Sequence, residues 1–279
     1  MIIIPQQTPT AKLHQYLLGA ISPRPICFAS TIDENGNPNL SPFSFFNVFG
    51  SNPVTLIFSP ARKVRDNSLK HTLENCMQQK EVVISVVNYA MVQQMSLASC
   101  EYPKGVSEFE KAGFTPQKAQ SVKPFLVAES PVNMECRVRE IIETGQEGGA
   151  GNLIICDVLM MHVKDEILNN ENQIDPHKID LVARMGGDYY CRASGDAVFV
   201  VPKPNMQLGI GIDALPGYIR NSKVLSGNDL GMLANISAIP SIDPNFIIQP
   251  HTDYEMEAKK CLSKNQVEHA WQFLLNFKK

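Results

Sequence analysis

The sequence lacks several features by which classes of protein are recognised. Its charges nearly balance, with 25 basic and 28 acidic residues. The composition therefore gives no indication of a basic surface that would bind nucleic acid or an anionic membrane. No stretch approaches the roughly 20 apolar residues of a transmembrane helix. The N-terminal "MIIIPQQTPT" has no basic region of the signal-peptide kind. We therefore expect a cytoplasmic protein without a nucleic-acid or membrane partner.

The cysteines and histidines form no recognisable disulfide or metal pattern. The seven cysteines are odd in number and scattered, and no two have the Cys-x-x-Cys spacing, which argues against a disulfide scaffold and against a zinc site. We expect most of them to be reduced core residues and no metal to be bound. The six histidines are also dispersed. His162 ends an apolar strand pattern, so a structural, hydrogen-bonded role is favoured over a catalytic one.

Motifs of common hydrolases and dinucleotide-binding enzymes are missing as well. The chain contains no His-Glu-x-x-His and no Gly-x-Ser-x-Gly. The Gly-x-Gly of "QLGIGID" lacks the preceding strand, the third glycine and the following helix that a Rossmann fingerprint requires. These absences leave the strand-rich first half of the chain as the place to look for a function.

What is present is a chain of 279 residues, 44% hydrophobic, which can bury a sizeable core. The β-prone stretch 25–32 runs into Asn35-Gly36, a strong hairpin signal that predicts a return strand through 38–48. Further buried strands are predicted at 54–59 and 81–87, with a helical pattern between them. Strands joined mainly by hairpins favour an antiparallel barrel over a doubly wound sheet.

A second hairpin is predicted later in the chain. Apolar and polar residues alternate strictly over 132–139, which indicates a half-buried strand with one face in water, and the glycine-rich "ETGQEGGAGN" turns the chain back into "LIICDVLMMHV". After about residue 195 proline and glycine become frequent. We therefore expect one domain over 1–195 and a C-terminal extension over 196–279, made of an extended arm and a terminal helix.

Two groups of residues could hold a flat, phosphorylated ligand. Small hydroxyls and phenylalanines stand together and could form a wall that is apolar on its body and polar along its edge; plain core and turn-capping serines are the alternative. These residues are Ser30, Thr31, Ser41, Ser44, Phe45 and Phe46. Near the start of the predicted helix, where free backbone amides and the dipole favour a phosphate, stand Lys70, His71, Thr72 and Asn75.

Five longer stretches follow one another in a recognisable order. They are "PRPICFASTIDENGNPNLSPFSFFNVFGSNPVTLIFSP", "KHTLEN", "GVSEFEKAGFTP", "VAESPVNMECRV" and "LVARMGGDYY". In this order they resemble the flavin reductase-like, FMN-binding split-barrel family, in its flavoredoxin-type branch. The resemblance spans roughly residues 15 to 195 and leaves 196–279 outside it.

The resemblance implies a fold, an assembly and a set of contacts. The fold would be mainly β with helical insertions, a six-stranded antiparallel Greek-key split barrel, and the chain would form a homodimer with FMN near the subunit interface. Met185 would begin a loop that closes over the flavin, Cys100–Phe114 would form a lid on the substrate side, and His71 replaces the usual aspartate. The isoalloxazine contacts would be Ala29, Ser30, Thr31, Ser44, Phe45 and Asn47, with Arg24 and Asn39 nearby, and the phosphate contacts would be Lys70, Thr72 and Asn75.

The implied activity is that of an oxidoreductase in which electrons pass from NADH or NADPH through bound FMN to a small-molecule or protein acceptor. No catalytic side chain is expected beyond the flavin, whose ring would be tuned by the neutral donors Asn47, Thr31 and Ser44. Two alternatives stay open. One is an FMN-binding electron carrier or flavin-binding module without its own NAD(P)H site, and the other is a structural protein that has lost the flavin.

Overall fold

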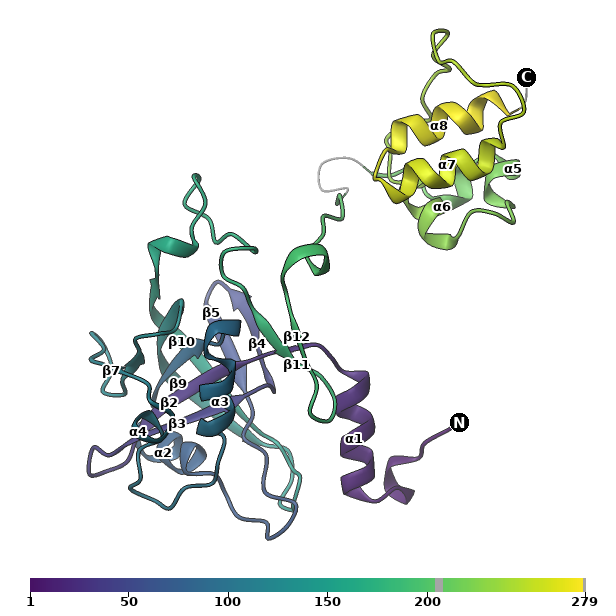
Figure 1. Cartoon of the computed structure of the whole chain (residues 1–279). Coiled ribbons are helices and arrows are strands. Elements are labelled where there is room, and N and C mark those ends of the chain that lie inside the picture. The colour runs from purple at the N-terminus through teal and green to yellow at the C-terminus, as the bar shows by residue number, and fades with distance from the viewer. Residues whose placement is uncertain (204–207, 278–279) are drawn as a thin grey trace. The chain divides into compact units, whose positions relative to one another are not determined.

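The computed structural model describes residues 1–203 and 208–277, which fall into two compact units. Unit 1 spans Met1–Phe199 and unit 2 spans Val200–Lys279 (Figure 1). Within the described ranges, no helix is both long and apolar enough to cross a membrane.

Unit 1 combines twelve described strands with short helices. The strands are β1 (Arg24–Pro25), β2 (Cys27–Ile32), β3 (Pro38–Phe43), β4 (Phe46–Ser51), β5 (Val54–Phe58), β6 (Glu81–Val86), β7 (Pro116–Gln117), β8 (Leu126–Val127), β9 (Val132–Glu143), β10 (Asn152–Val163), β11 (Val182–Arg184) and β12 (Tyr190–Arg192). The α-helices are α1 (Thr10–Ala20), α2 (His71–Gln79), α3 (Val92–Ala98) and α4 (Glu108–Ala112). The 3-10 helices are η1 (Pro5–Gln7), η2 (Tyr89–Met91), η3 (Asp165–Ile167) and η4 (Gly195–Ala197).

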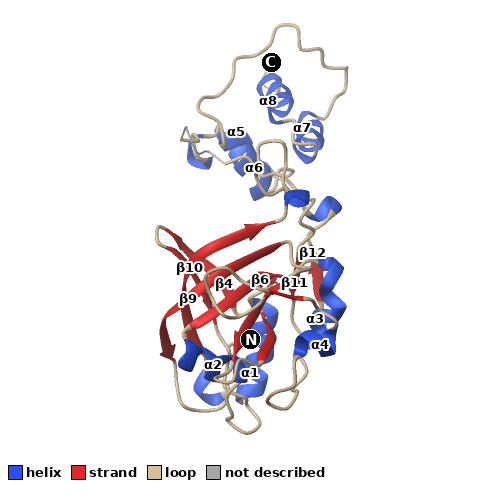
Figure 2. Cartoon of the chain, turned by 90° about the vertical axis from the view of Figure 1, so that its left-hand side faces the viewer, coloured by secondary structure: helices blue, strands red, loops and turns tan. Residues whose placement is uncertain are grey.

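The main sheet of unit 1 is antiparallel and has the strand order β3-β2-β6-β9-β10-β5-β4. Its two edge strands, β3 and β4, are joined by only Ser44 and Phe45. A flat sheet of this size would hold its edges about 29 Å apart, at about 4.8 Å per strand, whereas the linker from Phe43 to Phe46 reaches at most about 11 Å. The sheet must therefore curl until its edges meet (Figure 2).

The antiparallel split barrel predicted from the sequence is confirmed. Its main sheet is divided into seven strands where six were expected, because Ser44 and Phe45 break one predicted strand, 38–48, into β3 and β4. The predicted hairpin turn is also present: Gly36 has a φ of 84°, and the Asp33 carboxylate accepts hydrogen bonds from the backbone N–H groups of Asn35 and Asn37, each at 2.9 Å.

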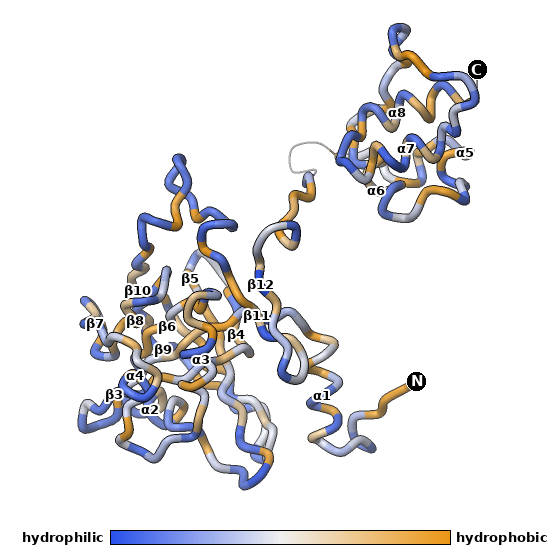
Figure 3. The backbone as a smooth tube through the Cα atoms, viewed as in Figure 1, coloured by the Kyte–Doolittle hydropathy of each residue, from blue (hydrophilic) through white to orange (hydrophobic). Residues whose placement is uncertain are grey.

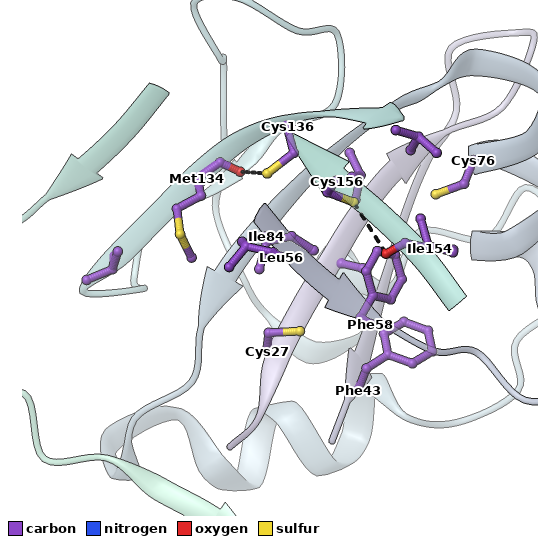
Figure 4. Packing of buried hydrophobic residues seen from close by; sticks show 14 of the residues in the cluster. Cys27, Phe43, Leu56, Phe58, Cys76, Ile84, Met134, Cys136, Ile154 and Cys156 are labelled. Atoms are coloured by element: carbon purple, nitrogen blue, oxygen red, sulfur yellow. Dashed lines mark hydrogen bonds between the residues drawn. The ribbon is translucent and has the colours of Figure 1, made fainter. Parts of the chain in front are cut away.

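The barrel encloses an apolar core to which α2 contributes Leu73 and Cys76 (Figure 4). Among its fully buried residues are Cys136 and Cys156, whose Sγ atoms contact the carbonyl oxygens of Met134 and Ile154 at 3.4 and 3.8 Å. Burial raises the pKa of the Cys136 thiol to about 12. These cysteines are therefore inert packing groups, as a scattered cysteine pattern indicates.

A second apolar cluster lies between the barrel and the helices α3 and α4, and it includes Phe28, Met95 and Phe109. Phe28 and Leu40 contribute to it from β2 and β3, while Cys27, Ala29 and Phe43 of the same two strands face the barrel core. In Figure 2, α2 lies below the strands and α3 with α4 lies to one side of them. The two faces of β2 and β3 are thus both covered.

The prediction that β9 has one face in water is wrong for its first half. Asn133 and Glu135 are buried, and only from Arg137 onward does the polar face reach solvent. The segment before β9 covers these two side chains: Asn133 Oδ1 accepts a hydrogen bond from Val127 N, and the Glu135 carboxylate accepts from Gln120 N and Ser121 N. Polar residues in an alternating pattern can be buried where backbone donors meet them.

Unit 2 is helical and has a core of its own. Its helices are η5 (Ile212–Ala214), α5 (Gly217–Arg220), α6 (Gly227–Ala234), α7 (Tyr254–Ser263) and α8 (Val267–Asn276). Trp271, the single tryptophan of the chain, is 1% exposed, and its Nε1 donates to Leu233 O at 3.2 Å. Hydrophobic and hydrophilic colours alternate along α7 and α8 in Figure 3, as expected of amphipathic helices.

The prediction of an extended arm with one terminal helix is therefore wrong for this region. Prolines and glycines suggested irregular structure, but they flank helices here: Pro216 is the N-cap of α5, and Gly217 and Gly227 are the first residues of α5 and α6. Ser226 caps α6 and forms a capping box with Asp229. The packing of several short helices around Trp271 outweighs their weak individual propensities.

Candidate functional site

One pocket of unit 1 lies where β3, the N-terminus of α2 and the chain following α3 converge. Both lysines of this pocket, Lys63 and Lys70, belong to the segment that leads from β5 into α2. Its lining also includes Asn39, Ser41, His71, Glu101 and Tyr102. The pocket is thus built from chain segments that are far apart in the sequence, and it carries both signs of charge.

The start of α2 has the features of an anion-binding site. Lys70 is the N-cap, with extended φ and ψ of −85° and 144°, and no side chain caps this helix end. Burial lowers the pKa of the Lys70 ammonium group. Uncapped N–H groups, the positive end of the helix dipole and a partly buried cation all favour a bound phosphate.

A buried polar network connects α2 to the strands β2 and β3. Asn39 Nδ2 donates to Thr31 Oγ1 at 3.2 Å and to Thr72 Oγ1 at 3.0 Å, and Asn75 Nδ2 donates to Thr31 Oγ1 at 3.1 Å. All four side chains are at most 8% exposed. The structure therefore brings together four residues that the sequence assigned to two different parts of the ligand. Thr72 and Asn75 point into this network, whereas Lys70 lines the pocket.

A second group of predicted site residues meets around the guanidinium group of Arg24. Its Nη2 donates to Met185 O at 3.0 Å, its Nε donates to Ser44 Oγ at 3.4 Å, and its Nη1 donates to the carbonyl oxygens of Leu18 and Ile21 at the end of α1. Burial, and next the nearby Arg184, lower the pKa of Arg24. Arg24 thus fastens α1 and the Met185 loop to the barrel.

The four remaining predicted site residues differ in burial: two are buried in the barrel wall and two are exposed to solvent. Ala29 packs in the barrel core, and Ser30 lies on the opposite face of β2, where its buried Oγ has no hydrogen-bond partner among the described residues. Phe45 is 41% exposed and makes an edge contact with His14, with ring centroids 6.2 Å apart. Asn47 is exposed on β4. Ala29 and Ser30 are fully buried on β2, which pairs with β3 and β6 on its two sides, and neither residue lines the pocket, while Phe45 and Asn47 face outward.

Sequence reasoning did not identify the pocket residue Lys63, and it included Glu101, Tyr102 and Glu108 only as part of the Cys100–Phe114 segment expected to form a lid. Glu108 is 4% exposed, its Oε2 accepts a hydrogen bond from Leu40 N at 2.9 Å, and burial raises the pKa of its carboxyl group. The basic run "ARKVRD" just before the helix and the acidic residues of the Cys100–Phe114 segment were the available signals.

His162 has the structural role that its pattern favoured. Its Nε2 lies 2.7 Å from Glu135 Oε1, and Glu135 is fully buried. Burial raises the pKa of Glu135, but the N–H groups of Gln120 and Ser121, followed by His162, outweigh it, so the net shift is downward. The pair holds the segment before β8 against the barrel, and neither residue lines the pocket described above.

Comparison with known proteins places this barrel in the class of split-barrel flavin proteins. Component B of nitrilotriacetate monooxygenase from Bacillus cereus has a similar structure, with a TM-score of 0.67 and 25% identity over 72% of this chain and 98% of that chain. A split-barrel protein from Shewanella frigidimarina, assigned as a flavin reductase, has a TM-score of 0.60 and 27% identity over 71% of this chain and 95% of that chain.

Sequence comparison narrows the class to one family. Residues 19–178 match the flavin reductase like domain. An uncharacterized protein of Aquifex aeolicus is 34% identical over 196 residues, which cover 70% of this chain and 97% of the relative. The chain therefore belongs to the flavin reductase-like family, as its sequence motifs indicated.

Proposed function

We propose that this protein is an NAD(P)H-dependent FMN oxidoreductase of the flavin reductase type. The observation that carries the proposal is the pocket at the start of α2, where Lys63 and Lys70 accompany an uncapped helix N-terminus. FMN differs from riboflavin by the phosphate that such a pocket selects. We assign residues 1–195 to the flavin-binding part and 196–279 to an appendage.

The residues present fit a bound flavin mononucleotide. Two ammonium groups and the first N–H groups of α2 match a phosphate, and Asn39 and Ser41 on β3 supply neutral polar groups beside it. Ser44 and the Met185 loop meet at Arg24, which does not line this pocket. A pocket that combines cations with neutral polar groups suits a ligand that has a phosphate at one end and a heteroaromatic ring at the other.

In this proposal FMN, when bound, supplies the ability to accept a hydride and pass electrons on. The chain's own residues bind and orient it. Lys70 and the N-terminus of α2 hold the phosphate, and the network of Thr31, Asn39, Thr72 and Asn75 keeps that helix end fixed relative to β2 and β3. Ser44 and Asn47 provide neutral hydrogen-bonding groups toward the ring, whereas the buried Thr31 hydroxyl acts through this network.

A homodimer completes the proposal. The edge strand β4 exposes Val48 and Phe49, which are 59% and 64% exposed, and Phe45 at its start is 41% exposed. An unpaired edge strand with neighbouring large apolar side chains favours pairing with another surface. Because Phe45 and Asn47 also face outward here, a second copy on β4 would bring its own residues next to the proposed ring contacts.

An anaerobic titration tests the activity directly. The protein is loaded with FMN, and NADH and NADPH are added in turn while the flavin absorbance near 450 nm, a general property of oxidised flavins, is recorded. We expect rapid and saturable bleaching by one or both donors. Bleaching that occurs only with dithionite or a reduced partner protein would instead favour an electron carrier, and a protein that does not retain FMN would contradict the proposal.

A further inference from the structure

Both walls of the proposed phosphate pocket carry charge. Lys63, Lys70 and His71 line one side, and Glu101 and Glu108 come from the chain following α3. Glu101 Oε2 lies 3.2 Å from Lys63 Nζ and 3.4 Å from Arg65 Nη2. Its pKa is lowered, first by the hydrogen bond to Lys63, and Lys70 adds to the same effect. A carboxylate of the chain itself thus pairs with Lys63, one of the two lysines that a ligand phosphate would need.

The two acidic residues are held in different ways. Glu108 is 4% exposed and accepts a hydrogen bond from the backbone of β3, so it is fixed in the fold. The Glu101 side chain is 49% exposed, and its partners are the side chains of Lys63 and Arg65, which are 24% and 75% exposed. Only Glu101 can therefore leave the pocket by a change of side-chain rotamer, without a backbone hydrogen bond being lost.

Lys63 itself is well placed to receive a different anion. Its backbone is fixed on both sides, because its N–H donates to Ser68 O at 3.1 Å and its carbonyl oxygen accepts from Asn67 N at 2.9 Å. A phosphate carries a charge of about −1.5 to −2 at neutral pH and three acceptor oxygens, more than the single charge of a carboxylate. A phosphate that reaches Lys63 and Lys70 together would therefore displace Glu101, which would otherwise repel it.

We propose that Glu101 is an intramolecular competitor for the phosphate site, and that it sets how strongly this protein prefers FMN over riboflavin. The inference rests on the proposed function and adds to it a specificity-determining pair, Glu101 and Lys63. In the absence of a phosphate ligand, Glu101 neutralises Lys63, and phosphate binding requires that this ion pair be broken. Riboflavin, which has no phosphate, leaves the ion pair intact.

The test measures dissociation constants of FMN and riboflavin by flavin fluorescence, on wild type and on Glu101→Gln. We expect FMN to bind the variant about two- to fivefold more tightly, because a partly exposed ion pair with Lys63 no longer has to be broken, while riboflavin binds unchanged. Glu110→Gln is the matched control, because Glu110 is exposed on α4, outside the pocket lining, and its substitution changes the net charge equally. It should alter neither constant. Circular dichroism confirms the fold of each variant.

A second experiment tests whether Lys63 is the cation for which Glu101 and the phosphate compete. In a Lys63→Met background FMN should bind more weakly, and the gain from Glu101→Gln should largely disappear. An equal effect on both flavins, an unchanged FMN constant in Glu101→Gln, or a full gain in the Lys63→Met background would each overturn the inference. If these occur while the protein binds FMN and bleaches with NAD(P)H, only the inference fails. If wild type binds neither flavin, the proposed function fails with it.

Discussion

Lys70 is the residue on which the proposed phosphate contact depends most directly. It occupies the N-cap of α2 and lines the pocket, and burial lowers the pKa of its ammonium group. A partly buried ammonium group attracts an anion more strongly than an exposed one, because less water separates and screens the two charges. Its partial burial in the pocket distinguishes Lys70 from a fully solvated lysine at the start of a helix.

We predict that Lys70→Ala loses affinity for FMN selectively. A charge-assisted hydrogen bond is worth roughly 1.5–3 kcal/mol, or about 10- to 150-fold in the dissociation constant, whereas riboflavin has no phosphate to lose. Lys80→Ala, at the exposed other end of α2, is the control and should change neither constant. Both constants are measured by fluorescence titration. Equal weakening of both flavins would indicate damage to the helix instead.

Glu108 leads to a prediction about stability and pH. Burial raises the pKa of its carboxyl group in the folded protein, so the charged form is disfavoured by folding. The contribution of Glu108 to the free energy of unfolding is therefore largest below its unfolded-state pKa of about 4.3. This contribution is lost as the pH rises through the higher pKa of the folded state. Glutamine keeps an oxygen that can accept the Leu40 N–H but carries no charge to desolvate.

We therefore expect the free energy of unfolding of Glu108→Gln, relative to wild type, to increase from about pH 4 to pH 7, the range above the ordinary glutamate pKa. Urea unfolding at several pH values, followed by circular dichroism, measures this difference. Glu110→Gln on the exposed side of the same helix is the control for the loss of one negative charge. A relative stability of Glu108→Gln that does not change with pH would contradict the prediction.

At the scale of elements, β4 combines an unpaired edge with a bulge. The pairing of β4 with β5 shifts register between Val48 and Gly50, so Phe49 has no partner across the strand pair. Val48 and Phe49 are then neighbours that both stay largely exposed. A bulge at an edge strand redirects side chains from the sheet, and here it presents an aromatic ring to solvent.

We predict that Phe49→Glu converts the proposed dimer into a monomer. Burial of one phenylalanine contributes about 1.5–3 kcal/mol, and a twofold interface contains it twice, so the dimer dissociation constant should rise by about 100-fold or more. Light scattering after gel filtration measures the mass. Ile247→Glu in unit 2, where the side chain is 83% exposed, is the control and should leave the mass unchanged. A wild-type protein that is monomeric and fully loaded with FMN would refute the homodimer.

At the scale of the whole molecule, the two units have separate cores. The barrel core and the cluster around Trp271 share no residue. Since Trp271 is the single tryptophan of the chain and lies in unit 2, its fluorescence reports on that unit alone. The proposed flavin site lies wholly in unit 1. Measurements of flavin binding therefore report on unit 1, whereas tryptophan fluorescence reports on unit 2.

We predict that FMN stabilises unit 1 without shifting the transition seen by Trp271. A ligand at 100 times its dissociation constant contributes about 2.7 kcal/mol, which raises the melting temperature of a domain of this size by about 5–10 °C. Scanning calorimetry should show one transition that moves with FMN and one that does not, the latter coinciding with the change in tryptophan fluorescence. A parallel shift of both transitions would mean that the units unfold together.

Elements with local signals can be predicted from the order of the amino acids alone. The hairpin at Asn35-Gly36 follows from a backbone angle that glycine adopts readily, and the helix over 71–79 follows from apolar residues spaced along one face. The ordered motifs gave the family, and with it Lys70 at the start of α2. Each of these depends on residues that are close in the chain.

Features that depend on residues far apart in the chain could be established only from the folded protein. Asn133 and Glu135 are buried because another segment brings backbone donors to them, and the helices α5 to α8 are stable because they share one core. Lys63 meets Glu101 because the chain before α2 and the chain after α3 converge at one pocket. The periodicity of side chains indicates the geometry of a single helix or strand. Contacts between residues of different elements depend on how those elements pack, and no local sequence pattern specifies that packing.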